Sequence, residues 1–203
     1  MSSDQPSSKA IVSLAARTML KEIEPGNHRQ LREGLEETPD RVAKAWQFWT
    51  HGYDLKAEAI VKSFKDGAEG VDEMVIEVDI PFYSHCEHHL APFFGLASVA
   101  YIPQCGPDGR VLGLSKMNRL VDMFARRLQV QERLTNQIAD AMQEFVKPLG
   151  CGVLLRARHM CVESRGVQHR GSTTTTSALR GVMKTQPETR AEFLHLARTT
   201  TTI

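Results

Sequence analysis

The clearest hydrophobic pattern in the chain is an alternation of apolar and polar residues with a period of two. It runs through residues 73–80, where the apolar members include Met74, Ile76 and Ile80, and again through residues 153–161. A period of two sends successive side chains to opposite faces, so each segment predicts a β-strand. We expect Pro81 to close the first strand, and residues 86–89 to follow as an irregular turn. Two further strands are predicted over residues 94–102 and over the threonine-rich residues 173–179.

Other segments carry apolar residues at helical spacing. A helix is predicted from Lys9 to Glu24, where Pro25 and Gly26 stop it. A second begins at Thr38, which acts as N-cap with Pro39 at the first helical position. Three more are predicted later in the chain, at 115–128, 134–145 and 187–198.

The order of these elements predicts the fold class. After residue 71 the order is strand, strand, helix, helix, strand, strand, which indicates an α+β fold, an antiparallel sheet with helices packed on one face. We divide the chain into a flexible N-terminus with the first helix (1–30), a helical extension (31–70) and a main domain (71–203). Residues 1–8 and the 199–202 tail are expected to be disordered or frayed, and residues 106–109 to form a turn.

Composition and charge exclude some classes of function. With 203 residues, 41% apolar content and a net charge of +1, the chain is a soluble globular protein without the strongly basic surface that bulk nucleic-acid binding needs. The sequence has no apolar span long enough to predict a membrane segment. Only four cysteines are present, and two stand beside histidines, so we expect a cytoplasmic protein in which metal binding is favoured over disulfides.

Two short motifs suggest a metal site. Cys86 and His89 have Cys-x-x-His spacing, and Cys161 follows His159 by two positions, which would put both on one face of the predicted strand. Three protein ligands and an open fourth position are typical of catalytic zinc, which activates a water molecule. His88 and His159 would then be the proton-transfer partners, since imidazole titrates near neutral pH. A fourth protein ligand would make the site structural instead, and the sequence leaves three residues open for that position: His85, Cys105 and Cys151.

A second group of residues suggests an anion and a base edge. Ser115 and Lys116 open a predicted helix, where free backbone amides favour anions, and Arg119 lies one turn later. Taken by themselves, these residues are better explained as a capped helix with a solvated basic face. The pair Gln131-Glu132 between two helices could be a cap, or could accept paired N–H donors such as those of guanine; Arg165 adds a cation after Cys161.

Taken together, these motifs resemble those of the GTP cyclohydrolase I family. The similarity rests on several motifs in one order, namely Glu37-Thr38-Pro39-Asp40-Arg41-Val42-Ala43-Lys44, Ser84-His85-Cys86-Glu87-His88-His89, Tyr101-Ile102-Pro103, Gly113-Leu114-Ser115-Lys116, Gln129-Val130-Gln131-Glu132-Arg133-Leu134, His159-Met160-Cys161 and Arg165-Gly166-Val167. The resemblance implies a tunnelling fold (T-fold) for the catalytic domain, and a cytoplasmic homodecamer with active sites at subunit boundaries. It implies hydrolytic opening of the GTP imidazole ring at C8, with release of formate and formation of 7,8-dihydroneopterin triphosphate, the first step of folate and pterin biosynthesis.

The resemblance also assigns roles to individual residues. It implies that Zn²⁺ is held by Cys86, His89 and Cys161, and that His88 and His159 carry protons. The implied partners are GTP and further copies of the chain, with no nucleic acid and no membrane. The substrate-binding residues that it implies are Glu132 and Gln131 for the guanine edge, Ser115, Lys116, Arg119 and Arg165 for the ribose and triphosphate, and Arg41 and Lys44 from a neighbouring subunit.

Two other readings stay open at this point. The first is another T-fold enzyme that acts on a purine- or pterin-like base. Examples are a pyruvoyltetrahydropterin synthase, with a multi-histidine zinc site, and a nitrile reductase, with a nucleophilic cysteine and no metal. The ligand set of two cysteines and one histidine disfavours both enzymes. The other reading is a non-enzymatic module stapled by zinc, which requires four protein ligands.

Overall fold

The computed structural model describes residues 7–25, 30–65, 68, 70–104, 106 and 109–198. The chain forms two compact units, Met1–His51 and Gly52–Ile203. Several expectations fall outside the described residues, among them the disorder of residues 1–6, the middle of the turn at 107–108 and the 199–202 tail. Within the described part of the chain, no helix combines the length and apolar composition needed to cross a membrane.

The N-terminal unit is a pair of helices. Helix α1 (Ser8–Ile23) begins where the Ala10 backbone N–H donates to Ser7 Oγ, a side-chain N-cap. The expected disorder of residues 7–8 is therefore wrong, because they cap and begin this helix. A short 3₁₀ turn, η1 (Glu33–Leu35), precedes α2 (Thr38–Trp49), which has Pro39 in its first turn. Both helices agree with the hydrophobic pattern, but Thr38 is the first helical residue of α2 and not its N-cap, which is Glu37.

The second unit is built on a five-stranded sheet in the order β5-β2-β3-β6-β7. All neighbouring strands are antiparallel except β2 and β5, and the β3–β6 register pairs Phe93 with His159. The predicted α+β class and all four predicted strands are therefore confirmed. The strand bounds are β2 (Val75–Cys86), β3 (Pro92–Ile102), β5 (Leu128–Gln129), β6 (Gly150–His159) and β7 (Thr174–Gly181).

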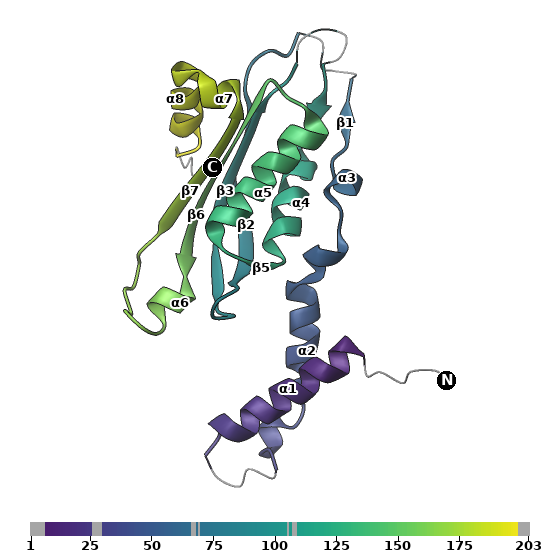
Figure 1. Ribbon diagram of the computed structural model, residues 1–203, viewed down its shortest axis with the longest axis vertical. Helices are drawn as coiled ribbons and strands as arrows, with labels where there is room; N and C mark the ends of the chain where they lie inside the picture. The colour runs from purple at the N-terminus through teal and green to yellow at the C-terminus, as the bar shows by residue number, and fades with distance from the viewer. Residues whose placement is uncertain are drawn as a thin grey trace, which may run out of the picture. The chain divides into compact units, whose positions relative to one another are not determined.

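Two helices cover one face of this sheet and bury the main core. Helices α4 (Leu114–Ala125) and α5 (Gln131–Ala141) lie side by side over the strands (Figure 1). Alternate residues of β6, including Val153 and Leu155, meet Leu120 of α4 and Ile138 of α5 in one buried cluster. The alternation in the sequence thus places the helix-covered face correctly.

The opposite face is also partly covered, which corrects the expectation of helices on one face only. Helices α7 (Val182–Thr185) and α8 (Pro187–Leu196) bring Phe193 onto Leu154 and Leu179, in a second cluster on the far side of the sheet. A Cβ at Gly152 would lie 3.0 Å from the Phe193 ring, so glycine allows this close packing. This second cluster has fewer buried residues than the main core.

Strand β2 also continues beyond the point at which it was predicted to stop. It runs through Pro81, which pairs with Leu96, and ends at Cys86. Strand β5 pairs only with His85 and Cys86, so Pro81 lies where β2 has one open edge and a missing N–H breaks no ladder. A bulge between Glu77 and Ile80, where Asp79 has a φ of 57°, shifts the register between β2 and β3 just before Pro81.

Short elements complete the second unit. Strands β1 (Ser63–Phe64) and β4 (Val111–Leu112) form a separate two-stranded ribbon. Helix α5 continues into a π-helical turn, η3 (Met142–Val146), which lengthens the helix predicted there. The remaining elements are η2 (His51–Asp54), α3 (Ala57–Ile60) and α6 (Met160–Glu163).

Candidate metal centre and active site

The first two candidate ligands lie at the end of β2. The chain turns immediately after Cys86, and the backbone N–H groups of His89 and Leu90 both donate to the Cys86 carbonyl. Leu90 has a positive φ of 54°, which helps to bring the chain back toward β3. The turn folds His89 over Cys86 and places its Nδ1 atom 3.7 Å from Cys86 Sγ. The Cys-x-x-His spacing therefore produces the predicted convergence.

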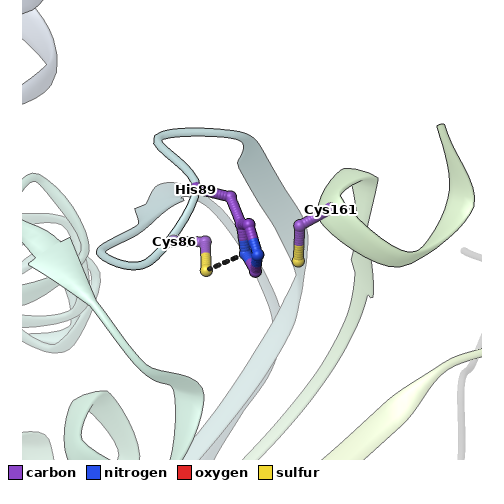
Figure 2. A group of neighbouring side chains, drawn as sticks. All are labelled: Cys86, His89 and Cys161. Carbon is purple, nitrogen blue, oxygen red and sulfur yellow. Dashed lines mark hydrogen bonds between the residues drawn. The ribbon is translucent and has the colours of Figure 1, made fainter. Parts of the chain in front are cut away.

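The third candidate ligand reaches this point from β6. Strand β6 ends at His159, and Cys161 lies on the short helix α6, so the prediction that both stand on one strand was wrong. The helical turn nevertheless directs the Cys161 sulfur toward the other two ligands (Figure 2). The ligand atoms of Cys86, His89 and Cys161 all lie within 4.8 Å of one another.

The dimensions of this group fit a zinc ion. Tetrahedral zinc, with bonds of about 2.3 Å to sulfur and about 2.1 Å to nitrogen, separates the two ligand atoms by about 3.6 Å. The 3.7 Å between Cys86 Sγ and His89 Nδ1 agrees with that value. Burial raises the pKa of the Cys161 thiol, and the nearby Cys86 raises it further. Metal binding here would therefore displace a proton from the Cys161 thiol.

Three residues were considered for a fourth ligand, and none of them belongs to the metal-ligating group of the described residues. Cys151 is buried on β6, donates to the Ala139 carbonyl, and has its pKa raised by burial to about 12. His85 is buried beside Cys86, but within the described residues the metal-ligating group contains neither His85 nor Cys151. Cys105 lies outside the described residues. The described ligand set thus has three members, as a catalytic site requires.

Both predicted proton carriers stand next to the metal-ligating group. His88 is exposed in the turn, with its Nε2 atom 3.7 Å from the Glu87 carboxylate. His159 is half-buried at the end of β6, and its ring stacks on Phe93 at 4.7 Å between centroids and 3° between planes. Burial lowers the pKa of His159, and the charge of Glu132 acts in the opposite direction. The lowered pKa favours the neutral form of the His159 imidazole, the form that can accept a proton.

The first turn of α5 supplies the predicted base-binding pair. Glu132 is exposed and close enough for its charge to act on His159. Gln131 is only 1% exposed, and its side-chain oxygen lies 2.7 Å from His159 Nε2. The two neighbours therefore differ, because Glu132 can reach a ligand while Gln131 is occupied inside the protein.

The predicted phosphate-binding residues of the second unit lie on two elements. Ser115, Lys116 and Arg119 are in the first two turns of α4, and Arg165 follows α6. Arg165 is near enough to Cys161 to lower the pKa of that thiol. Among the described residues, no hydrogen bond or ion pair engages these four side chains, which leaves them available to an anion.

Arg41 and Lys44, which the resemblance assigns to a neighbouring subunit, both belong to the N-terminal unit. Each is exposed on α2, and Arg41 donates to Thr38 of the same helix and to Glu37, which precedes it.

Several supporting residues were not predicted as part of the site. Phe93 stacks on His159, and Arg133 donates to both oxygens of Glu87 at 2.7 Å, which ties the metal-binding turn to α5. Phe93 has only the hydrophobic signal of any core residue. Arg133 stands next to Glu132 and was named only as a member of the motif at residues 129–134, with no role of its own. Neither pairing has a spacing that a single sequence could indicate.

Comparisons with known proteins agree on one family. The family model described as GTP cyclohydrolase I matches residues 12–198. The proteins named GTP cyclohydrolase 1 in Janthinobacterium sp. (strain Marseille) and Nitrosospira multiformis are 58% and 55% identical to this chain, each over 82% of it and over 82% and 85% of their own lengths. The protein of that name in Deinococcus radiodurans is 54% identical over 80% of this chain and 73% of its own length.

Among solved structures, the archaeosine synthase QueF-Like in the apo form is a weaker match, with a TM-score of 0.43 and 19% identity over 53% of this chain and 93% of its own. The family assignment does not depend on it. On the family match and the level of identity, the chain belongs to the GTP cyclohydrolase I family of hydrolases.

Proposed function

We propose that this protein is a zinc-dependent GTP cyclohydrolase that opens the imidazole ring of GTP at C8, releases formate and forms 7,8-dihydroneopterin triphosphate. The observation that carries the proposal is the convergence of Cys86, His89 and Cys161 beside His159, in a chain of this family. The same reaction would make the protein the entry point to folate and pterin biosynthesis.

Zinc is the metal that best suits the ligand set. Two thiolates and one imidazole are soft and borderline donors, which select zinc over magnesium or calcium. When bound, zinc would lower the pKa of a water molecule and so make hydroxide available near neutral pH as the nucleophile for a carbon such as C8. Free thiols at Cys86 and Cys161 are required for this role, and they fit a reducing, cytoplasmic setting.

The two histidines would carry protons between substrate and solvent. C8 lies between two nitrogens and becomes more electrophilic when N7 is protonated, so the reaction needs both an acid and a base. His159 suits the base because burial lowers its pKa. His88 is exposed and can exchange protons with water. We assign both to the proton transfers of ring opening, formate loss and ribose rearrangement.

Glu132 would hold the guanine edge. Guanine presents two adjacent N–H donors at N1 and N2, and a carboxylate accepts both with its two oxygens. Its charge acts on His159, so a base held by Glu132 would lie close to the proton-transfer site. Gln131 was expected to help by direct contact; its internal hydrogen bonds favour an indirect contribution.

The cations would bind the triphosphate away from C8. Lys116, Arg119 and Arg165 have charge available, and Ser115 would contact the ribose or phosphate region. Binding energy gathered at the triphosphate can position the base for reaction. We propose that Arg41 and Lys44 contribute from a neighbouring subunit.

The family also suggests the T-fold and a homodecamer of two stacked rings with sites at subunit boundaries. The sheet order and the helix pair over one face are compatible with a T-fold domain spanning residues 71–203. Strand β7 forms one edge of the sheet, and an open edge can pair with another strand. We therefore propose self-association, with GTP bound as the substrate.

The proposal is tested by incubating the zinc-loaded protein with GTP, with and without a chelator. Formate is measured together with the fluorescent pterin that oxidation of the product yields. We expect both products in equal amounts and their loss on chelation. A folded, zinc-loaded protein that yields neither product from GTP would refute the proposed function.

A further inference from the structure

The side chain of Gln131 is part of a closed hydrogen-bond network inside the second unit. Its Nε2 atom lies 3.2 Å from the Leu155 carbonyl, 3.0 Å from the Thr174 carbonyl and 3.0 Å from Thr176 Oγ1. Its Oε1 atom lies 2.7 Å from His159 Nε2. A buried amide with all its polar atoms engaged has no free group for a ligand.

The network fixes which end of the amide is the nitrogen. Thr135 Oγ1 donates to the Gln131 backbone carbonyl at 2.7 Å, which uses its only proton. Thr176 must therefore donate its own proton to Thr135, 2.6 Å away, and can only accept from Gln131. Two backbone carbonyls face the same Gln131 atom, and carbonyls only accept. That atom must be the NH₂ group, so the amide oxygen faces His159.

The orientation of Gln131 in turn fixes the proton on His159. An amide oxygen only accepts, so His159 Nε2 must carry a hydrogen in order to bond to it at 2.7 Å. The stack on Phe93, with 3° between the ring planes, fixes the plane of the imidazole, and the bond to Gln131 fixes which nitrogen faces the amide. Among the described residues, His159 Nδ1 has no hydrogen-bond partner.

We infer that Gln131 is a positioning residue that holds His159 as the Nε2–H tautomer, so that Nδ1 is the atom that exchanges protons with the substrate. The inference rests on the proposed function for the identity of that substrate. It replaces direct contact between the Gln131 side chain and guanine. Without the amide oxygen, the imidazole would distribute between two tautomers and could rotate, and fewer molecules would present a lone pair at Nδ1. A histidine held in the wrong tautomer loses catalytic power even where the geometry is unchanged.

The variant Gln131→Met tests this role, because methionine has a similar length and no strong acceptor. A matched control is Gln129→Met, since Gln129 is equally buried two residues earlier and its Nε2 donates to the Phe124 carbonyl and to Gln137 rather than to a histidine. With GTP as substrate, we expect Gln131→Met to lower kcat by at least about tenfold. We expect KM within about twofold of the wild-type value, and unchanged zinc content. The control should keep both constants.

A kcat that is unchanged in Gln131→Met, or a raised KM with unchanged kcat, would overturn the inference; the second result would return Gln131 to the guanine edge. A neutron structure of the deuterated wild-type protein reads the tautomer without any assay. A deuteron on His159 Nε2 supports the inference, and one on Nδ1 alone overturns it. The neutron structure tests the inference even if the methionine variant fails to fold. It also separates the two claims, because wild-type protein that releases no formate from GTP refutes the proposed function and leaves the tautomer readable.

Discussion

Arg133 and Glu87 form a two-pronged ion pair that links the first turn of α5 to the turn carrying His88 and His89. Both terminal guanidinium nitrogens lie 2.7 Å from carboxylate oxygens. The Glu87 backbone N–H also donates to the Gln129 carbonyl, so the metal-binding turn is held from two directions. The pair fixes the metal end of the site relative to Glu132, the neighbour of Arg133.

Removing this tie is expected to loosen the metal-binding turn without unfolding the protein. For Arg133→Ala we expect zinc affinity to fall about tenfold, as for other residues that orient metal ligands. The free energy of unfolding should change by less than about 1 kcal/mol, because the pair is partly exposed. Arg180→Ala is the control, since Arg180 pairs with Asp140 farther along the same helix. Equal zinc affinity in the two variants, measured by competition with a chromogenic chelator, would contradict this role.

Metal content distinguishes the ligand cysteine from the buried one. Cys161→Ala removes a proposed ligand, so we expect the purified variant to lose most of its zinc and all detectable formate release. Cys151→Ala removes a thiol that is hydrogen-bonded to the Ala139 carbonyl and is not a proposed ligand. This variant should retain its zinc and its formate release. Elemental analysis of the two variants provides the comparison. Full zinc content in Cys161→Ala would show that the ligand set is misassigned.

The raised pKa of Cys151 predicts slow chemical labelling. With a pKa of about 12, only about one molecule in ten thousand is a thiolate at about pH 8. Iodoacetamide should therefore leave Cys151 unmodified in the native protein and alkylate it in denaturant, as read by peptide mass spectrometry. Rapid labelling of Cys151 in native protein would mean that β6 opens or that the thiol is less buried than described.

The ion pair between Arg158 and Glu163 predicts a pH-dependent contribution to stability. Hydrogen bonding to Arg158, 2.6 Å away, lowers the pKa of Glu163 from its usual 4.5. A lowered carboxyl pKa stabilises the folded state above that value, and the contribution is lost as the pH falls through the folded-state pKa. Glu163→Gln should therefore reduce the melting temperature more at about pH 6 than at about pH 3. An equal reduction in melting temperature at both pH values would show that the ion pair is not the cause.

The hydrophobic pattern predicted most of the fold, because alternation and helical spacing depend on local geometry. It failed where tertiary context decides: β2 passes through Pro81 because one edge of the strand is open, and Phe193 covers the far face because Gly152 leaves room. Cys161 was expected on a strand that ends two residues earlier.

The candidate site was predictable to the extent that its residues are adjacent in sequence. The spacing of Cys86 and His89 and the presence of His159 before Cys161 indicated the metal group, which the structure brings together. The tie from Arg133 to Glu87 joins residues 46 positions apart, and no local pattern encodes it. The same is true of the contact between Gln131 and His159, which depends on how α5 packs against β6.

The central claim is a division of labour in which Cys86, His89 and Cys161 hold zinc while His159 moves protons. The variant His159→Ala tests it most directly when zinc content and formate release are measured on the same folded sample. We expect the zinc content of the wild-type protein, and formate release from GTP lowered by at least about a hundredfold. Two results would contradict this division of labour: loss of zinc as well as loss of turnover, or formate release at the wild-type rate.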